Sequence, residues 1–122
     1  MLFRSSWLNH SINPTKIIDD DFRIEVGRGV NKYSMSILNI SGTSFGSISP
    51  KAIQAFSAGA KKGGFAHNTG EGSFSKYHSL GGGDIIWQIS TGYFGCRTKS
   101  GEFDANEFKK IAKNPQDRKS TV

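Results

Sequence analysis

Residues 49–67 read SPKAIQAFSAGAKKGGFAH and predict a helix that leads directly into a strand. Ser49 and Pro50 are residues preferred at the N-cap and at the first position of a helix. Apolar residues then recur at helical spacing, at Ile53, Phe56 and Ala60. The pair Gly63-Gly64 is a typical helix stop. The stretch therefore predicts one helix followed by a short strand over 64–67.

Apolar runs bounded by turn residues predict further strands on both sides of this unit. We expect buried strands over 34–40 and 84–90, and one short strand over 22–26. Asp104 and Glu107 form a capping-box pattern that predicts a final helix ending near Ala112. Alternating strands and helices are typical of a parallel α/β fold.

Glycine-rich turns follow each of the main predicted strands, at 41–46, 68–72 and 91–95. In parallel α/β folds ligands bind at the carboxyl ends of the strands. The sequence thus predicts that these turns converge on one rim. Around this α/β part, 34–113, we expect an irregular lead-in over 1–33 and a disordered tail over 114–122.

Composition excludes several other classes of protein. The net charge of +6 raises the possibility of nucleic-acid binding, but the cations are dispersed and no nucleic-acid motif accompanies them, so a solvated basic surface is favoured. The single cysteine, Cys96, rules out an internal disulfide framework, and no cluster of residues has metal-ligand spacing. We expect no membrane span, no secretory signal and a cytoplasmic location.

Five segments, in the same order, resemble the FMN-binding synthase domain of glutamate synthase and its shorter stand-alone relatives. They are Trp7–Ile12, Asn39–Ser49, Gly63–Gly72, Gly81–Ile89 and Thr91–Thr98. The second resembles an Asn-Ile-Ser-x-Met-Ser-Phe-Gly signature, and the third contains the Asn-Thr-Gly-Glu-Gly loop of that family. The resemblance covers nearly the whole chain.

The resemblance implies an α/β fold of the (β/α)8 TIM-barrel type. A complete barrel takes roughly 250 residues, so 122 residues would supply about the first three β/α units. We therefore expect an N-terminal or central fragment of the barrel. The resemblance implies FMN as cofactor. Full-length relatives can also carry an iron–sulfur cluster, whose ligands this chain does not supply.

The family's site residues map onto the three turns. By resemblance, Ser41, Gly42, Thr43 and Ser44 would pass beneath the flavin ring, and Asn68, Thr69 and Gly70 would form a second flavin-facing loop. Gln88 would offer its amide to the ring, Tyr93 and Arg97 would lie near the substrate, and Glu71 would be the catalytic proton carrier. From the residues alone, Glu71 also fits an exposed turn and Gln88 a satisfied rim amide.

The implied activity is reductive amination of 2-oxoglutarate to glutamate through an imine, as part of ammonia assimilation. Ammonia would come from a glutamine amidotransferase unit, and electrons from an NADPH- or ferredoxin-linked donor. Tyr93 stands where larger relatives carry an arginine, and Thr43 replaces a methionine. The alternative is a truncated, non-catalytic remnant that does not bind FMN alone.

Overall fold

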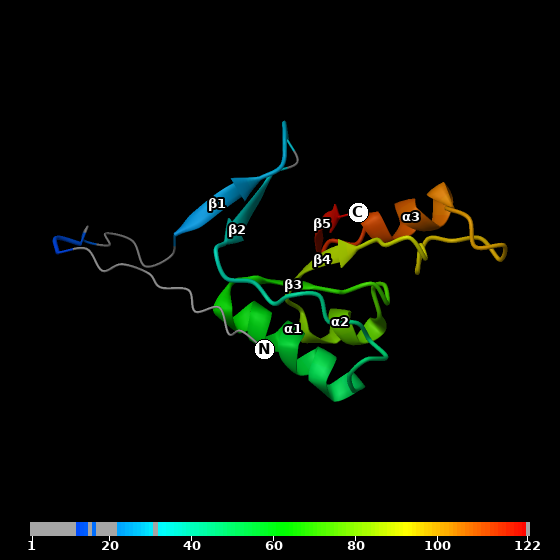
Figure 1. Cartoon of the computed structure of the whole chain (residues 1–122), viewed down its shortest axis with the longest axis horizontal. Coiled ribbons are helices and arrows are strands. Elements are labelled where there is room, and N and C mark those ends of the chain that lie inside the picture. Colours follow the sequence, from blue (N-terminus) through cyan, green and yellow to red (C-terminus); the bar gives the residue numbers. More distant parts are fainter. Residues whose placement is uncertain (1–11, 15, 17–21, 31, 122) are drawn as a thin grey trace, which may run out of the picture.

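The computed structural model describes residues 12–14, 16, 22–30 and 32–121. Its elements (Figure 1) are, in order, β1 (Arg23–Val26), β2 (Tyr33–Ser36), α1 (Pro50–Gly63), β3 (Ala66–Asn68), α2 (Lys76–Gly81), β4 (Asp84–Gln88), α3 (Ala105–Ala112) and β5 (Asp117–Thr121).

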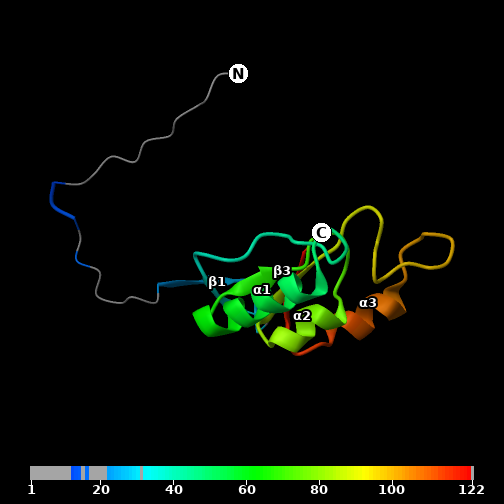
Figure 2. The same cartoon turned by 90° about the horizontal axis from the view of Figure 1, so that it is seen from below.

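A parallel sheet of order β3-β4-β5 forms the centre of the fold. The segment around Ile40 extends it on the β3 side, because Ile40 N donates to Ala66 O (2.9 Å) and Ile40 O accepts from Asn68 N (3.0 Å). One helix lies in each connection between these neighbouring strands. Figure 2 shows the three helices in a row along one side of the molecule. The predicted alternation of strands and helices is confirmed, whereas the assignment to part of a (β/α)8 barrel stays a prediction.

Strands β1 and β2 form an antiparallel hairpin outside this sheet (Figure 1). Arg23 Nη1 donates to Gly64 O (2.8 Å), and the Tyr33 hydroxyl donates to Asp84 Oδ2 (2.8 Å). Gly64 lies two residues before β3 and Asp84 begins β4, so the hairpin is bonded near the amino ends of these two strands.

The predicted buried strand over 34–40 is wrong. Residues up to Ser36 pair with β1, and the chain then crosses to the parallel sheet, where only Ile40 bridges to β3. The apolar side chains on which the prediction rested, Ile37 and Leu38, are 62% and 74% exposed. The short strand predicted over 22–26 is confirmed as β1.

Helix α1 begins and ends as the sequence predicts. Ser49 Oγ accepts from Ala52 N (3.2 Å), Pro50 occupies the first helical turn, and Gly64 terminates the helix in the left-handed conformation (φ 66°). A glycine is favoured there because a Cβ would be strained at this φ. Asp104 likewise caps α3, accepting from the backbone N–H groups of Asn106 and Glu107.

Helix α2, which lies between β3 and β4, was not predicted from the sequence. It packs side by side with α1 (Figure 1), and the two helices approach closely at Gly81, which has no side chain. A Cβ on Gly81 would lie 2.4 Å from Ser57 Cβ and 2.5 Å from Ala58 N. The Ser57 hydroxyl donates to His78 O (2.7 Å) across this contact.

A core of Trp87, Ile89 and Cys96 lies between the sheet and α3, with Phe108 and Ile111 packed against it. The Trp87 and Phe108 rings stack with centroids 5.6 Å apart. Strand β4 contributes consecutive buried residues, Ile85, Ile86 and Trp87, as expected of a strand covered on both faces.

The tail predicted to be disordered carries β5, which pairs in parallel with β4. Gln116 leads into this strand: its Nε2 lies 3.2 Å from Gly83 O, and its carbonyl accepts from Ile85 N (2.7 Å). The prediction failed because the segment is polar and lacks the apolar alternation that marks strands.

Candidate functional site

The first two glycine-rich turns are hydrogen-bonded to each other at the carboxyl ends of their strands. Thr43 N donates to Asn68 O (3.2 Å), and Gly72 N donates to Ser44 Oγ (3.1 Å). The Phe45 ring then packs on Tyr77 of α2, with centroids 4.8 Å apart. The predicted convergence of these turns is therefore confirmed.

Two glycines allow this close approach. A Cβ on Gly70 would lie 2.6 Å from Ser44 Oγ and 2.8 Å from Ser44 N, and Gly70 has a φ of 64°. A Cβ on Gly42 would lie 2.8 Å from Gln88 Oε1 and 3.2 Å from Gly70 Cα. Gly70 is therefore restricted to glycine by backbone atoms and by its φ, whereas a side chain at Gly42 would require the Gln88 amide to move.

The hydroxyl of Thr69 joins the second turn to β4. It accepts from Gln88 N (3.1 Å) and donates to Gly70 O (2.9 Å), and the whole residue is buried. Thr69 was expected to contact a cofactor. In this structure its side chain instead holds the turn in place.

Two amides stand side by side at the ends of β3 and β4. Asn68 Oδ1 accepts from Gly70 N (2.8 Å), and no bond to its Nδ2 is formed by the described residues. Gln88 Nε2 makes one long contact, 3.4 Å, to Ser90 Oγ. Both side chains are half-buried. They are the polar groups of the rim best able to bind the edge of a planar heterocycle.

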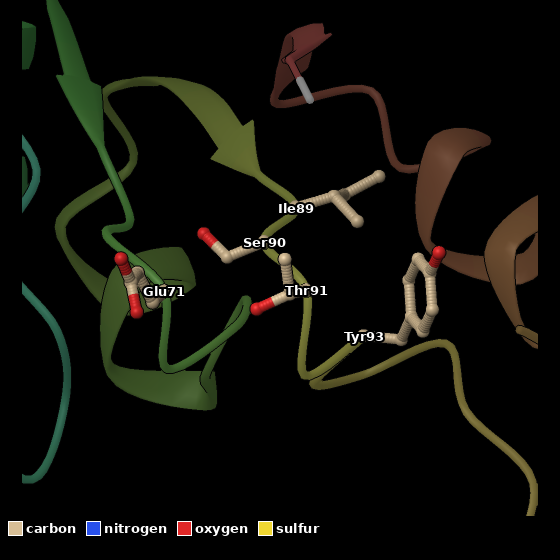
Figure 3. Close-up of a pocket in the computed structure, with 5 residues that line it drawn as sticks. All are labelled: Glu71, Ile89, Ser90, Thr91 and Tyr93. Atoms are coloured by element: carbon tan, nitrogen blue, oxygen red, sulfur yellow. The ribbon is translucent and has the colours of Figure 1, made fainter. Parts of the chain in front are cut away.

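Next to these amides lies a pocket of about 350 Å³, lined by Glu71, Ile89, Ser90, Thr91 and Tyr93. In Figure 3 Glu71 approaches from the second turn and Tyr93 stands on the opposite side, with Ser90 and Thr91 between them. Glu71 itself is exposed. Ser90 and Thr91 were not predicted as site residues, although two hydroxyl side chains directly after a buried strand were a usable signal.

Two non-glycine residues near this pocket adopt positive φ: Ser73 (75°) and Tyr93 (47°). Such backbone conformations cost of order 1 kcal/mol or more and are found where the surrounding structure enforces them. Ser73 is packed against the third turn, since a Cβ on Gly95 would lie 1.9 Å from Ser73 Oγ. The second and third turns are thus interlocked as well.

Arg97, expected near the substrate, does not line the pocket. Its guanidinium carbon lies 4.3 Å from the centroid of the Phe94 ring, and its Nη1 donates to Gly92 O (3.4 Å). Arg97 also pairs with Phe103 in a short antiparallel bridge. The Arg97 guanidinium therefore contacts the third turn and not the pocket.

Behind the rim, two histidines are buried side by side: His67 of β3 and His78 of α2. Because side chains alternate along a strand, His67 faces away from the side of Asn68. Its ring lies 5.3 Å from that of His78 and 5.7 Å from that of Phe56, and neither of its nitrogens has a hydrogen-bond partner among the described residues. Burial, together with the neighbouring His78, lowers the pKa of His67 to about 4. Burial also lowers the pKa of His78.

No group of three or more histidine, cysteine or acidic side chains within the described ranges is arranged to hold a metal ion. Among the helices of that part of the chain, none is long and apolar enough to cross a membrane. Burial, and then the nearby Asp104, raise the pKa of the Cys96 thiol, which therefore stays protonated in the core.

Comparison with known proteins gives two matches. Residues 21–112 match the family described as "Conserved region in glutamate synthase". The chain is also 44% identical over 85 residues to the glutamate synthase large subunit-like protein YerD of Bacillus subtilis (strain 168). That similarity covers 69% of this chain but only 16% of the relative. No solved structure matches the chain.

Proposed function

Because the chain belongs to the glutamate synthase family, we propose that it is part of an FMN-dependent oxidoreductase that aminates 2-oxoglutarate to glutamate. The supporting observation is the pair of half-buried amides, Asn68 and Gln88, beside a pocket that contains Glu71. As the chain covers only 16% of its relative, the activity of the whole protein is a proposal for the parent enzyme.

Asn68 and Gln88 would hold the flavin ring, because their amides supply both donors and acceptors to ring heteroatoms. The turns 41–44 and 68–70 are hydrogen-bonded to each other, and Thr69 of the second turn accepts from Gln88 N, so the two amides would be held on one rim. When bound, FMN would supply the hydride chemistry, which the protein orients. No described lysine or arginine lines the pocket beside the amides, so we assign only the ring end of the cofactor to this chain.

Glu71 would serve as the proton-handling residue. Its carboxylate lies at the pocket with the Ser90 and Thr91 hydroxyls, which can orient a small polar substrate by hydrogen bonds. We propose that Glu71 holds the proton exchanged at the substrate nitrogen. Ammonia from an amidotransferase unit and electrons from an NADPH- or ferredoxin-linked donor complete the proposed reaction.

A second candidate function is that of a non-catalytic remnant. It is favoured by the exposed apolar side chains Ile37 and Leu38, which leave this part of the α/β unit uncovered. The remnant hypothesis requires that the purified chain binds no flavin, whereas the proposed function requires measurable binding.

Titration of FMN into the purified chain separates these two functions. We expect flavin fluorescence to be quenched on binding, and Gln88→Ala to weaken the affinity by about fivefold, because one hydrogen bond contributes roughly 1 kcal/mol. Gln54→Ala is the control, since Gln54 lies on α1 and belongs neither to the turns nor to the pocket lining. No quenching by the wild-type chain would favour the remnant, and equal affinity of both variants would contradict the role of Gln88.

A further inference from the structure

The first turn of helix α2 fixes the ring of His78 in one tautomer. The backbone N–H of Ser75 donates to His78 Nδ1 (3.1 Å), and the Ser75 hydroxyl lies 2.8 Å from the same nitrogen. A backbone N–H can only donate, so Nδ1 acts as an acceptor and carries no proton. Burial lowers the pKa of His78 below its ordinary value of 6.5, so the ring is neutral at pH 7. Its single proton therefore lies on Nε2.

The Nε2–H of His78 lies in the interior, close to the first glycine-rich turn. The residue is fully buried, and its ring centroid lies 5.3 Å from that of His67 and 6.0 Å from that of Phe74. Burial lowers the pKa of His78, and the Thr43 backbone partly offsets that change by raising it. A backbone group raises the pKa of a histidine by accepting a hydrogen bond from the ring, so the group involved is the Thr43 carbonyl.

The contact between His78 Nε2 and the Thr43 carbonyl is looser than a standard hydrogen bond. Nε2 has no hydrogen-bond partner of standard geometry among the described residues. A buried N–H without an acceptor is costly, so shortening of this contact is favoured. On its other side Thr43 is held by its own N–H, which donates to Asn68 O (3.2 Å). Thr43 thus lies between β3 and the His78 ring.

Packing holds α2 against the same turn. The Tyr77 ring, one residue before His78, lies 4.8 Å from the Phe45 ring between centroids. The Ser57 hydroxyl donates to His78 O (2.7 Å) and links the backbone of this residue to α1. His78 is therefore fixed at its ring by Ser75 and at its backbone by Ser57. Its Nε2–H is a donor that is oriented before any ligand binds.

We propose that His78 is a positioning residue, whose Nε2–H holds the Thr43 carbonyl and thereby sets the first turn against the flavin ring. Asn68 and Gln88 would contact the ring, whereas His78 would act only through the turn that contains Thr43. This inference rests on the proposed function for the identity of the cofactor. The contact between His78 and Thr43 itself requires no flavin, so it can be tested separately.

Two amide variants separate this role from simple capping of α2. In His78→Gln the side-chain N–H groups reach about as far as Nε2 of histidine, so a donor toward Thr43 is kept while the acceptor for Ser75 N is lost. In His78→Asn the shorter amide keeps an acceptor for Ser75 N and loses the donor toward Thr43. We expect the FMN affinity of His78→Gln to stay within about twofold of the wild type and that of His78→Asn to fall about fivefold, through loss of one hydrogen bond. If His78 only caps α2, the order of the two variants is reversed.

NMR of the full 122-residue chain without FMN tests the contact directly. Nitrogen spectra of the ring should show the His78 proton on Nε2. The Ser44 amide nitrogen belongs to the same peptide group as the Thr43 carbonyl, so its signal should shift in His78→Asn and stay near the wild-type position in His78→Gln. Ser57→Ala is the control, because it removes the bond to His78 O and leaves the ring in place. It should lower Tm without moving the Ser44 signal or changing the FMN affinity.

The proposal is overturned if the His78 proton lies on Nδ1, or if the two amide variants shift the Ser44 signal equally. Dispersed spectra establish that the variants are folded. If neither folds, the wild-type Nε2–H must show a nuclear Overhauser effect to protons of Thr43, and its absence overturns the proposal. FMN binding that is equally tight in the wild type and in His78→Asn would overturn this inference alone. A wild-type chain that binds no FMN would contradict the proposed flavin site, while the NMR signals still decide whether His78 holds Thr43.

Discussion

Acidification from pH 7 to pH 4 is expected to lower the free energy of unfolding by about 3 kcal/mol through His67 alone. This histidine is fully buried beside His78 and Phe56, and its pKa falls from 6.5 to about 4. The unfolded chain therefore binds the proton more readily than the folded chain does. The destabilisation begins as the pH falls through 6.5 and is complete below about 4.

Urea unfolding at several pH values, followed by circular dichroism, measures this effect. Carboxylates also protonate in this range, so the informative quantity is the difference between the wild type and His67→Leu. The variant removes the titrating group while retaining a side chain of similar volume, and its stability should depend much less on pH. Parallel curves for the two proteins would show that His67 is not the responsible group.

Gly81→Ala is expected to destabilise the chain by about 2 kcal/mol or more, through overpacking of the contact between α1 and α2. The added Cβ would lie 2.5 Å from the backbone N of Ala58, which cannot move without displacing α1. The helices would have to separate, which would also stretch the bond from the Ser57 hydroxyl to His78 O. In thermal unfolding we expect a decrease in Tm of about 10 °C.

Gly59→Ala is the matched control. Gly59 also lies in a helix, α1, but a Cβ built on it has no atom within 4 Å. Alanine should therefore stabilise α1 by about 0.5–1 kcal/mol, because it restricts the unfolded chain and favours the helix. If both alanine variants shift Tm in the same direction by similar amounts, the α1–α2 contact is not as tight as the distances indicate.

The sequence predicts the elements that carry local signals. Helix α1 is predicted because Ser49, Pro50 and Gly64 each satisfy a backbone requirement at its ends. Helix α2 is missed because it spans only six residues and is held by packing of Gly81 on α1, a contact distant in sequence. Strand β5 is missed because its stability comes from backbone pairing with β4 and not from apolar side chains.

In the candidate site, too, features with local sequence signals were predictable and features set by distant contacts were not. The turns were recognisable from their glycines, and their convergence follows from parallel strands. The orientation of individual side chains was not predictable, because it depends on contacts across turns. Thr69 is turned inward by its bonds to Gln88 N and Gly70 O, and Arg97 is drawn outward by Phe94. No local pattern encodes either contact.

The order of the strands has a consequence for how the chain folds during synthesis. Each strand of the parallel sheet, from the Ile40 segment through β3 and β4 to β5, pairs with the strand that precedes it in the sequence. Chains leave the ribosome from the N-terminus at about 5–20 residues per second. The strand with which each new strand pairs has therefore already been synthesised. The sheet can therefore grow vectorially, one strand and one helix at a time. Each crossover joins strands that are consecutive in the sequence, and the entropic cost of closing a loop grows only slowly with its length.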